Sequence, residues 1–135
     1  MVDLLRFRAW DKKFKEMVQV DALVFDEQLI KATYKNGNVV KEDLKNYVLM
    51  QSTGLKDKNG KEIFEGDILT TGKRTGVVKN HRTLGFYIND ARGDNWWFGS
   101  VVDLAEFEDF TRDVARKIGI LGNIYTNPEL VEVKK

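Results

Sequence analysis

Four acidic residues lie close together in the middle of the chain, between Asp57 and Asp67. They are Asp57, Glu62, Glu65 and Asp67. Carboxylate oxygens suit hard metal ions, and a pair of carboxylates can transfer protons. The same segment is also typical of turns, because an Asp side chain accepts hydrogen bonds from nearby backbone amides. The turn pattern favours a structural role, and the alternating oxygen ligands of a calcium loop are missing.

Other residue patterns of catalysis are absent from the sequence. His81 is the single histidine, so one chain can assemble neither a catalytic triad nor a two-histidine metal site. Ser52 and Ser100 lack the Gly-x-Ser-x-Gly frame of a nucleophile. The chain has no cysteine, which excludes thiolate chemistry and is typical of a reducing compartment such as the cytoplasm. We therefore predict that the protein is not an enzyme and has no cofactor or metal.

A stretch between Asp67 and Asp90 contains basic but no acidic residues. Its cations include Lys73, Arg74, Lys79 and Arg82, and Tyr87 follows them. Cations beside aromatic rings are typical of single-stranded nucleic-acid binders, since they contact phosphates and stack on bases. We keep these five residues as an alternative, nucleic-acid-binding site. A solvated hairpin explains the same cations, and the net charge of +1 provides no general attraction to nucleic acid.

Three tryptophans raise the question of an interface. Trp96 and Trp97 are neighbours in an expected strand, so their side chains point to opposite faces of the sheet. If one face covers the core, at most one of the two can be part of that core. Trp10 raises the same question in the first expected strand. Exposed tryptophan is enriched at protein interfaces. We predict that one of the three contributes to an interface, with plain packing as the alternative.

Composition and length indicate a folded domain that positions these residues. The chain has 135 residues, of which 42% are hydrophobic and 32% charged, as in globular proteins and unlike disordered ones. Charges interrupt every apolar run near the N-terminus, so we expect no signal peptide and no membrane partner.

Periodicity predicts a chain of short strands. Alternation over residues 5–10, a polar turn and an apolar return predict a hairpin over residues 4–20. Further strands are expected at 23–25, 29–34, 39–40, 47–51, 68–69, 76–79, 84–88 and 96–98. Residues 41–46 are expected to form a loop or one helical turn, and 101–110 fit either a helix or a strand. The regular spacing with Gly-rich turns favours a small barrel or sandwich.

Three segments together resemble one protein family. They are FRAWDKKFKEM at 7–17, MQSTGLKDKNGKEIFEGDIL at 50–69 and IGILGNIYTNPEL at 118–130. In order and spacing they resemble the YopX family, small proteins encoded mainly by phages and prophages of low-GC Gram-positive bacteria. The middle segment is the most specific of the three.

The resemblance implies an architecture but no established activity. It implies a mainly β fold of coiled sheets with little helix and an SH3-like small barrel in the C-terminal half. We place a β lobe at 1–52 and the barrel lobe at 53–135. The resemblance also implies symmetric homo-oligomers. The predicted function is a non-enzymatic phage or prophage accessory protein that self-assembles and binds a phage or host protein in the host cytoplasm.

Overall fold

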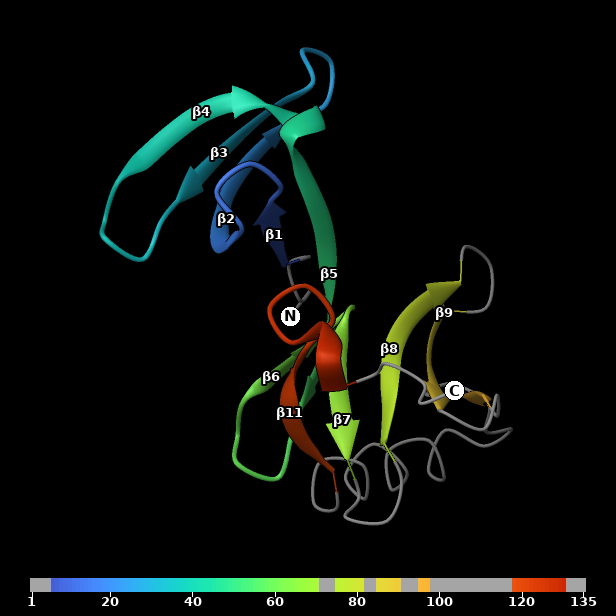
Figure 1. The fold of residues 1–135 in the computed structure, drawn as a ribbon. Helices are drawn as coiled ribbons and strands as arrows, with labels where there is room; N and C mark the ends of the chain where they lie inside the picture. The colour runs from blue at the N-terminus through green and yellow to red at the C-terminus, as the bar shows by residue number, and fades with distance from the viewer. Residues whose placement is uncertain (1–5, 71–74, 82–84, 91–94, 98–117, 131–135) are drawn as a thin grey trace. The chain divides into compact units, whose positions relative to one another are not determined.

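The computed structural model describes residues 6–70, 75–81, 85–90, 95–97 and 118–130 (Figure 1). The chain divides into two compact units, Met1–Ser52 and Thr53–Lys135, here called unit 1 and unit 2. No helix in these described ranges is long and apolar enough to cross a membrane.

Unit 1 is a curved antiparallel sheet (Figure 1). Its elements are β1 (Phe7–Asp11), β2 (Glu16–Val24), β3 (Leu29–Thr33), β4 (Val39–Asp43), the short 3-10 helix η1 (Leu44–Asn46) and β5 (Tyr47–Lys56), which continues into unit 2. The strand order is β4-β3-β2-β1-β5, followed by β6. Alternate apolar residues form the core of unit 1 on one face, here called the inner face. They include Ala9, Val18, Ile30, Ala32 and Tyr47.

Unit 2 contains a second antiparallel sheet. Its elements are β6 (Glu62–Phe64), β7 (Asp67–Thr70), β8 (Thr75–His81), β9 (Gly85–Asp90), β10 (Asn95–Trp97), β11 (Gly119–Asn123) and the 3-10 helix η2 (Pro128–Leu130). The five-stranded sheet has the order β10-β9-β8-β7-β11. Its core consists of Ile63, Leu69, Val78, Ile88 and Ile118.

The prediction of a mainly β chain with little helix is confirmed. The first hairpin forms from β1 and β2, and η1 supplies the helical turn expected within 41–46. The two strands expected before and after Asp21 are one strand, β2, because a register shift between Val20 and Ala22 accommodates the extra residue. Strand order is linear in both sheets, so the described residues do not close a barrel. Residues 101–110 lie outside the described ranges.

Gly76 shows how tightly β8 and β9 pack. A Cβ atom at Gly76 would overlap Ile88 Cγ2 and lie 3.0 Å from the backbone oxygen of Asn89. Gly76→Ala is therefore expected to lower the free energy of unfolding by about 1–3 kcal/mol, as overpacking does. Chemical denaturation measures this. Gly119→Ala is the control, because the three atoms nearest to its Cβ all belong to the flexible side chain of Lys58. Equal losses in both variants would contradict the account.

Candidate functional site

Asp57 is a buried structural acceptor. Asp57 is only 5% exposed, and its Oδ1 accepts hydrogen bonds from the backbone amides of Asn59 at 2.9 Å and Lys61 at 2.8 Å. Its Oδ2 accepts from the amide of Ile120 at 3.1 Å. Burial raises the pKa of the Asp57 carboxyl, but these three amides outweigh burial and hold it below its usual value. Asp57 thus joins the turn before β6 to β11.

Asp67 also serves a turn. It is 2% exposed, and its Oδ2 accepts from the amide of Phe64 at 2.8 Å. Glu62 and Glu65 are half-buried. In the described part of the chain no three acidic, histidine or cysteine residues are placed to hold a metal ion. The turn interpretation therefore accounts for the two buried carboxylates of the acidic segment.

Part of the predicted nucleic-acid site forms a row across unit 2. Lys79 on β8 lies opposite Tyr87 on β9, and Tyr87 lies opposite Trp97 on β10. Lys79 is exposed and Tyr87 is half-buried. The other three predicted cations, Lys73, Arg74 and Arg82, lie outside the described residues.

The predicted tryptophans occupy different register rows. Trp96 lies opposite Ile88, which in turn lies opposite Val78, and both of these are buried. Trp97 shares the row of Lys79 and Tyr87 instead. Trp10 is half-buried on β1, where its register partners are Met17 and Val48.

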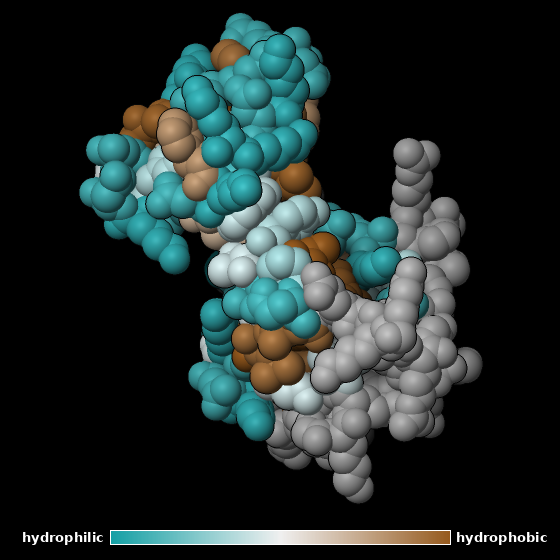
Figure 2. All heavy atoms as spheres, viewed as in Figure 1, coloured by the Kyte–Doolittle hydropathy of each residue, from teal (hydrophilic) through white to brown (hydrophobic). Residues whose placement is uncertain are grey.

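A groove that the sequence did not reveal lies on unit 1. It has a volume of about 340 Å³ and is lined by residues of β2, β3 and β4. Some of the lining residues lie at the alternate strand positions whose side chains point away from the core. These residues define what we call the outer face. They are Ala22, Val24, Leu29, Lys31, Val39 and Lys41. Val39 is 57% exposed and Val24 is 37% exposed. Figure 2 shows separate apolar areas on the otherwise hydrophilic surface of unit 1.

Strand register puts two lysines together in this groove. Lys31 on β3 lies directly opposite Lys41 on β4, and Ala22 on β2 completes their row. Leu29 and Val39 belong to the rows on either side. Like charges directly opposite one another destabilise a sheet. The outer face therefore combines apolar surface with two lysines directly opposite one another.

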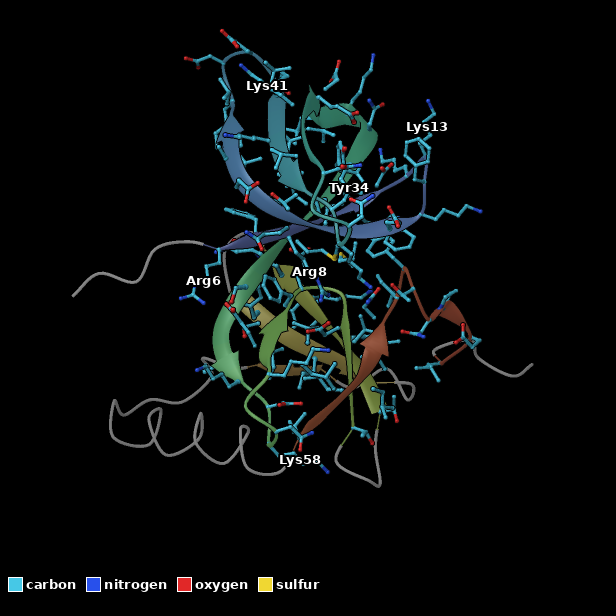
Figure 3. All side chains as sticks on the ribbon, turned by 90° about the vertical axis from the view of Figure 1, so that its left-hand side faces the viewer. Arg6, Arg8, Lys13, Tyr34, Lys41 and Lys58 are labelled. Atoms are coloured by element: carbon cyan, nitrogen blue, oxygen red, sulfur yellow. The ribbon has the colours of Figure 1, made fainter. Side chains whose placement is uncertain are left out.

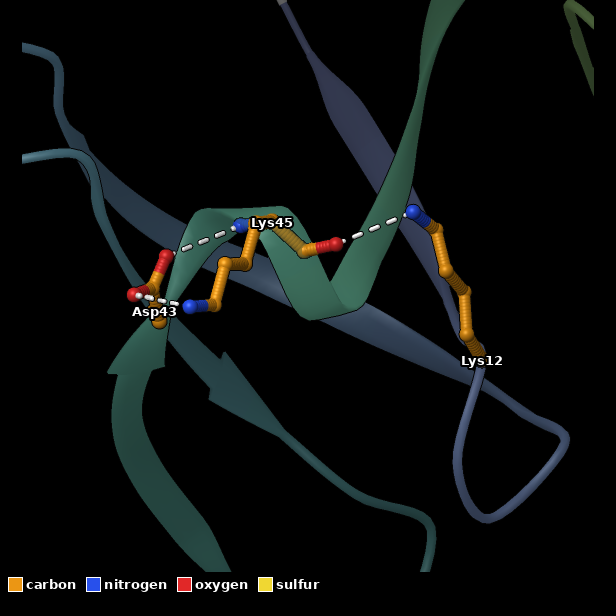
Figure 4. A network of polar contacts seen from close by, with 3 residues as sticks. All are labelled: Lys12, Asp43 and Lys45. Carbon is orange, nitrogen blue, oxygen red and sulfur yellow. Dashed lines mark hydrogen bonds and ion pairs between the residues drawn. The ribbon is translucent and has the colours of Figure 1, made fainter.

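Acidic side chains of β2 and β4 bond to residues other than Lys31 and Lys41. Asp43 on β4 accepts from the amide of Lys45 at 3.1 Å, and its other oxygen lies 3.7 Å from Lys45 Nζ (Figure 4). Lys12 Nζ secures the same turn by donating to the Lys45 carbonyl at 2.9 Å. Asp21 accepts from Gln19 and Thr33. No ion pair joins the ammonium groups of Lys31 and Lys41 to another residue that the structure describes.

Glu42 belongs to a polar chain on the inner face. Tyr47 Oη donates to Glu42 Oε2 at 2.7 Å and lies 2.8 Å from Tyr34 Oη, which donates to Asp11. Figure 3 shows Tyr34 within the curved sheet of unit 1, whereas Lys41 lies near the margin of that unit. Burial, followed by the hydrogen bond to Asp11, raises the pKa of Tyr34 to about 12. Burial likewise raises the pKa of Tyr47. Glu42 is thus held on the face opposite Lys41.

Comparisons with known proteins identify relatives by sequence and by structure. The family model described as YopX protein matches residues 6–132. The crystal structure of protein EF1440 from Enterococcus faecalis is 29% identical and has a TM-score of 0.58, and the match covers 97% of this chain and 100% of that chain. A search of curated proteins gives no match.

Proposed function

Because this chain belongs to the YopX family, we propose that it is a non-enzymatic protein-interaction module that binds through the outer face of unit 1. The observation that carries the proposal is the groove over β2, β3 and β4. Single exposed apolar residues are common on any protein, but a concave cluster of them is typical of binding sites. Rigid strands hold this cluster, so little conformational entropy is lost when a partner is bound.

The biological setting is part of the same proposal. Its basis is the family resemblance: the protein serves a phage or prophage as an accessory factor and binds a phage or host protein in the host cytoplasm. Self-assembly into a symmetric homo-oligomer, with Trp10, Trp96 or Trp97 at the contact, belongs to it as well. Sedimentation velocity at high micromolar concentration tests the assembly. A single monomeric species would overturn that part alone.

A displayed library of random twelve-residue peptides tests the outer face as a binding site. The full chain is immobilised, and enriched peptides are measured against two variants. Ala22→Arg fills the groove, whereas Asn59→Arg adds the same side chain to an exposed turn of unit 2. We expect peptides that bind the wild type and Asn59→Arg alike and bind Ala22→Arg more than about tenfold more weakly. Failure to enrich peptides, or equal binding to Ala22→Arg, would overturn the proposal.

Nucleic-acid binding is a second candidate because Lys79, Tyr87 and Trp97 share one register row. A lysine and aromatic residues in one register row are the residue types that contact the backbone and bases of a single strand. Labelled single-stranded DNA and RNA are titrated at low salt. Binding that weakens with salt and with Lys79→Glu, but not with Lys56→Glu, supports this function. Absence of binding would eliminate it.

A further inference from the structure

We infer that the partner of the outer face is an extended peptide segment that adds as a strand to β4 and presents an acidic side chain to Lys41. This inference rests on the proposed function, since the added strand would extend the sheet beside the groove and line the β4 border of the outer face. Three features of unit 1 support it: the edge position of β4, the opposed Lys31 and Lys41, which form no ion pair with the described residues, and the exposed side chain of Val39.

β4 has one edge without a neighbouring strand among the described residues, because it ends the strand order. The backbone amide of Leu44 donates a hydrogen bond to the carbonyl oxygen of Gln28, so these two opposite residues are a hydrogen-bonded pair. This pair determines which residues of β4 form hydrogen bonds with β3. Antiparallel pairs alternate between bonded and non-bonded. Val40 and Glu42 therefore bond to β3, and Val39 and Lys41 direct their backbone N–H and C=O groups away from the sheet. These groups are the template that an added strand uses.

The two lysines of the outer face favour an acidic side chain at one position of the added strand. Lys31 and Lys41 form a non-bonded pair, the kind in which opposing side chains are closer. Glu42 and Asp43 are engaged with Tyr47 and Lys45, respectively. A carboxylate on the added strand opposite Lys41 would relieve the repulsion, since directly opposite charges stabilise neighbouring strands. An apolar residue opposite Val39 would cover a side chain that is 57% exposed.

A second copy of the chain fits this edge less well. Two-fold antiparallel pairing of β4 with itself, centred on residue 41, places Lys41 against its own copy. Pairing centred on residue 42 places Lys41 opposite Asp43 of the second copy, but it also places the two Glu42 residues directly opposite one another. Centring on residue 40 leaves Lys41 opposite the partner's Val39, without a carboxylate. Like charges directly opposite disfavour the first two arrangements, and the third leaves the lysine pair uncompensated. A different protein segment is the better occupant.

The test uses three fluorescent peptides and the full chain. The first contains Thr-Thr-Glu-Val-Val, which in antiparallel pairing sets its Glu opposite Lys41 and its last Val opposite Val39. The second replaces the Glu by Lys. The third keeps the Glu but has a methyl group on the backbone amide nitrogen of that Glu. The methyl group removes the N–H that would donate to the backbone of β4. Anisotropy titrations compare wild type, Lys31→Glu/Lys41→Glu and, as a matched control at exposed positions of unit 2, Lys56→Glu/Lys58→Glu.

We expect the first peptide to bind the wild type at least about tenfold more tightly than either of the others. The Lys31→Glu/Lys41→Glu variant should prefer the Lys peptide, and the control variant should behave as wild type. Equal binding of the methylated peptide would overturn strand addition, and an unchanged charge preference would overturn the role of the lysine pair. If library peptides require the groove but the Glu peptide does not bind, this inference fails while the proposed function stands. If the chain self-associates and Lys31→Glu/Lys41→Glu abolishes this self-association, the occupant of the β4 edge is a second copy of the chain. That result would overturn the inference of a different protein segment.

Discussion

Replacing Asp57 by alanine is expected to lower the free energy of unfolding by about 3 kcal/mol. The carboxylate accepts from the amides of Asn59, Lys61 and Ile120 in a residue that is 5% exposed. Removing it leaves these donors without their acceptor, and a buried unsatisfied donor costs about 1–3 kcal/mol. Urea denaturation followed by circular dichroism measures the loss. Asp26→Ala, at an exposed turn of unit 1, is the control; a similar change in both variants would contradict the role of Asp57.

The lowered pKa of Asp57 adds a dependence on pH. A carboxyl whose pKa is lower in the folded than in the unfolded state stabilises the fold above the unfolded value, which is about 3.9. That contribution is lost as pH falls through the lower, folded value. Wild-type stability should therefore fall more steeply than that of Asp57→Asn below about pH 4. Parallel acid titrations of the two proteins would refute the assignment.

Asp11→Ala is expected to lower the free energy of unfolding by about 2–3 kcal/mol. Asp11 is 2% exposed, and its Oδ1 accepts from the amides of Lys13 at 2.8 Å and Phe14 at 3.1 Å. Its Oδ2 accepts from Tyr34 Oη. The substitution therefore weakens the turn between β1 and β2 and the polar chain of the inner face together. Tyr34→Phe keeps the turn bonds and should cost less; a loss as large as that of Asp11→Ala would contradict this division.

Asp11 also controls the ionisation of Tyr34. A tyrosine whose folded pKa is raised contributes stability that is fully present below its unfolded pKa of about 10 and is lost as pH rises through the folded value of about 12. Asp11→Ala should lower the pKa of Tyr34, because it removes a hydrogen bond and a negative charge that oppose ionisation. Ultraviolet titration of tyrosinate, with Tyr34→Phe to identify the signal, measures the change. An unchanged titration would show that Asp11 is not the cause.

Local patterns in the sequence predicted a large part of the fold. Three segments predicted the family, which the match over residues 6–132 confirms. Asn-Gly is a common sequence in tight hairpin turns, and Asn36-Gly37 lies in the turn between β3 and β4 with Gly37 at φ +91°, a value that glycine adopts readily. Turn chemistry also predicted that Asp57 accepts from nearby amides. Its bond to Ile120, 63 residues away, depends on the pairing of distant strands and has no local signal.

The outer face could not be predicted because strand register creates it. Lys31 and Lys41 are unremarkable in the sequence until β3 and β4 pair with residue 31 opposite residue 41. Residues 41–46 were expected to form a loop or a helical turn, whereas β4 continues to Asp43. A register shifted by one residue would turn these side chains toward the other face. Strands were expected at 29–34 and 39–40, but neither their register nor the continuation of the second strand to Asp43 was predicted.

Hydrogen exchange at individual amides of unit 1 tests the central claim most directly. In the free protein the Val39 and Lys41 amides should exchange rapidly, because they point away from β3, while Val40 and Glu42 are protected by their ladder bonds. Adding the Thr-Thr-Glu-Val-Val peptide should slow exchange at Val39 and Lys41 and leave unit 2 unchanged. Unaltered exchange at Val39 and Lys41 under saturating peptide, or protection confined to unit 2, would contradict the assignment of the outer face and its β4 edge as the binding surface.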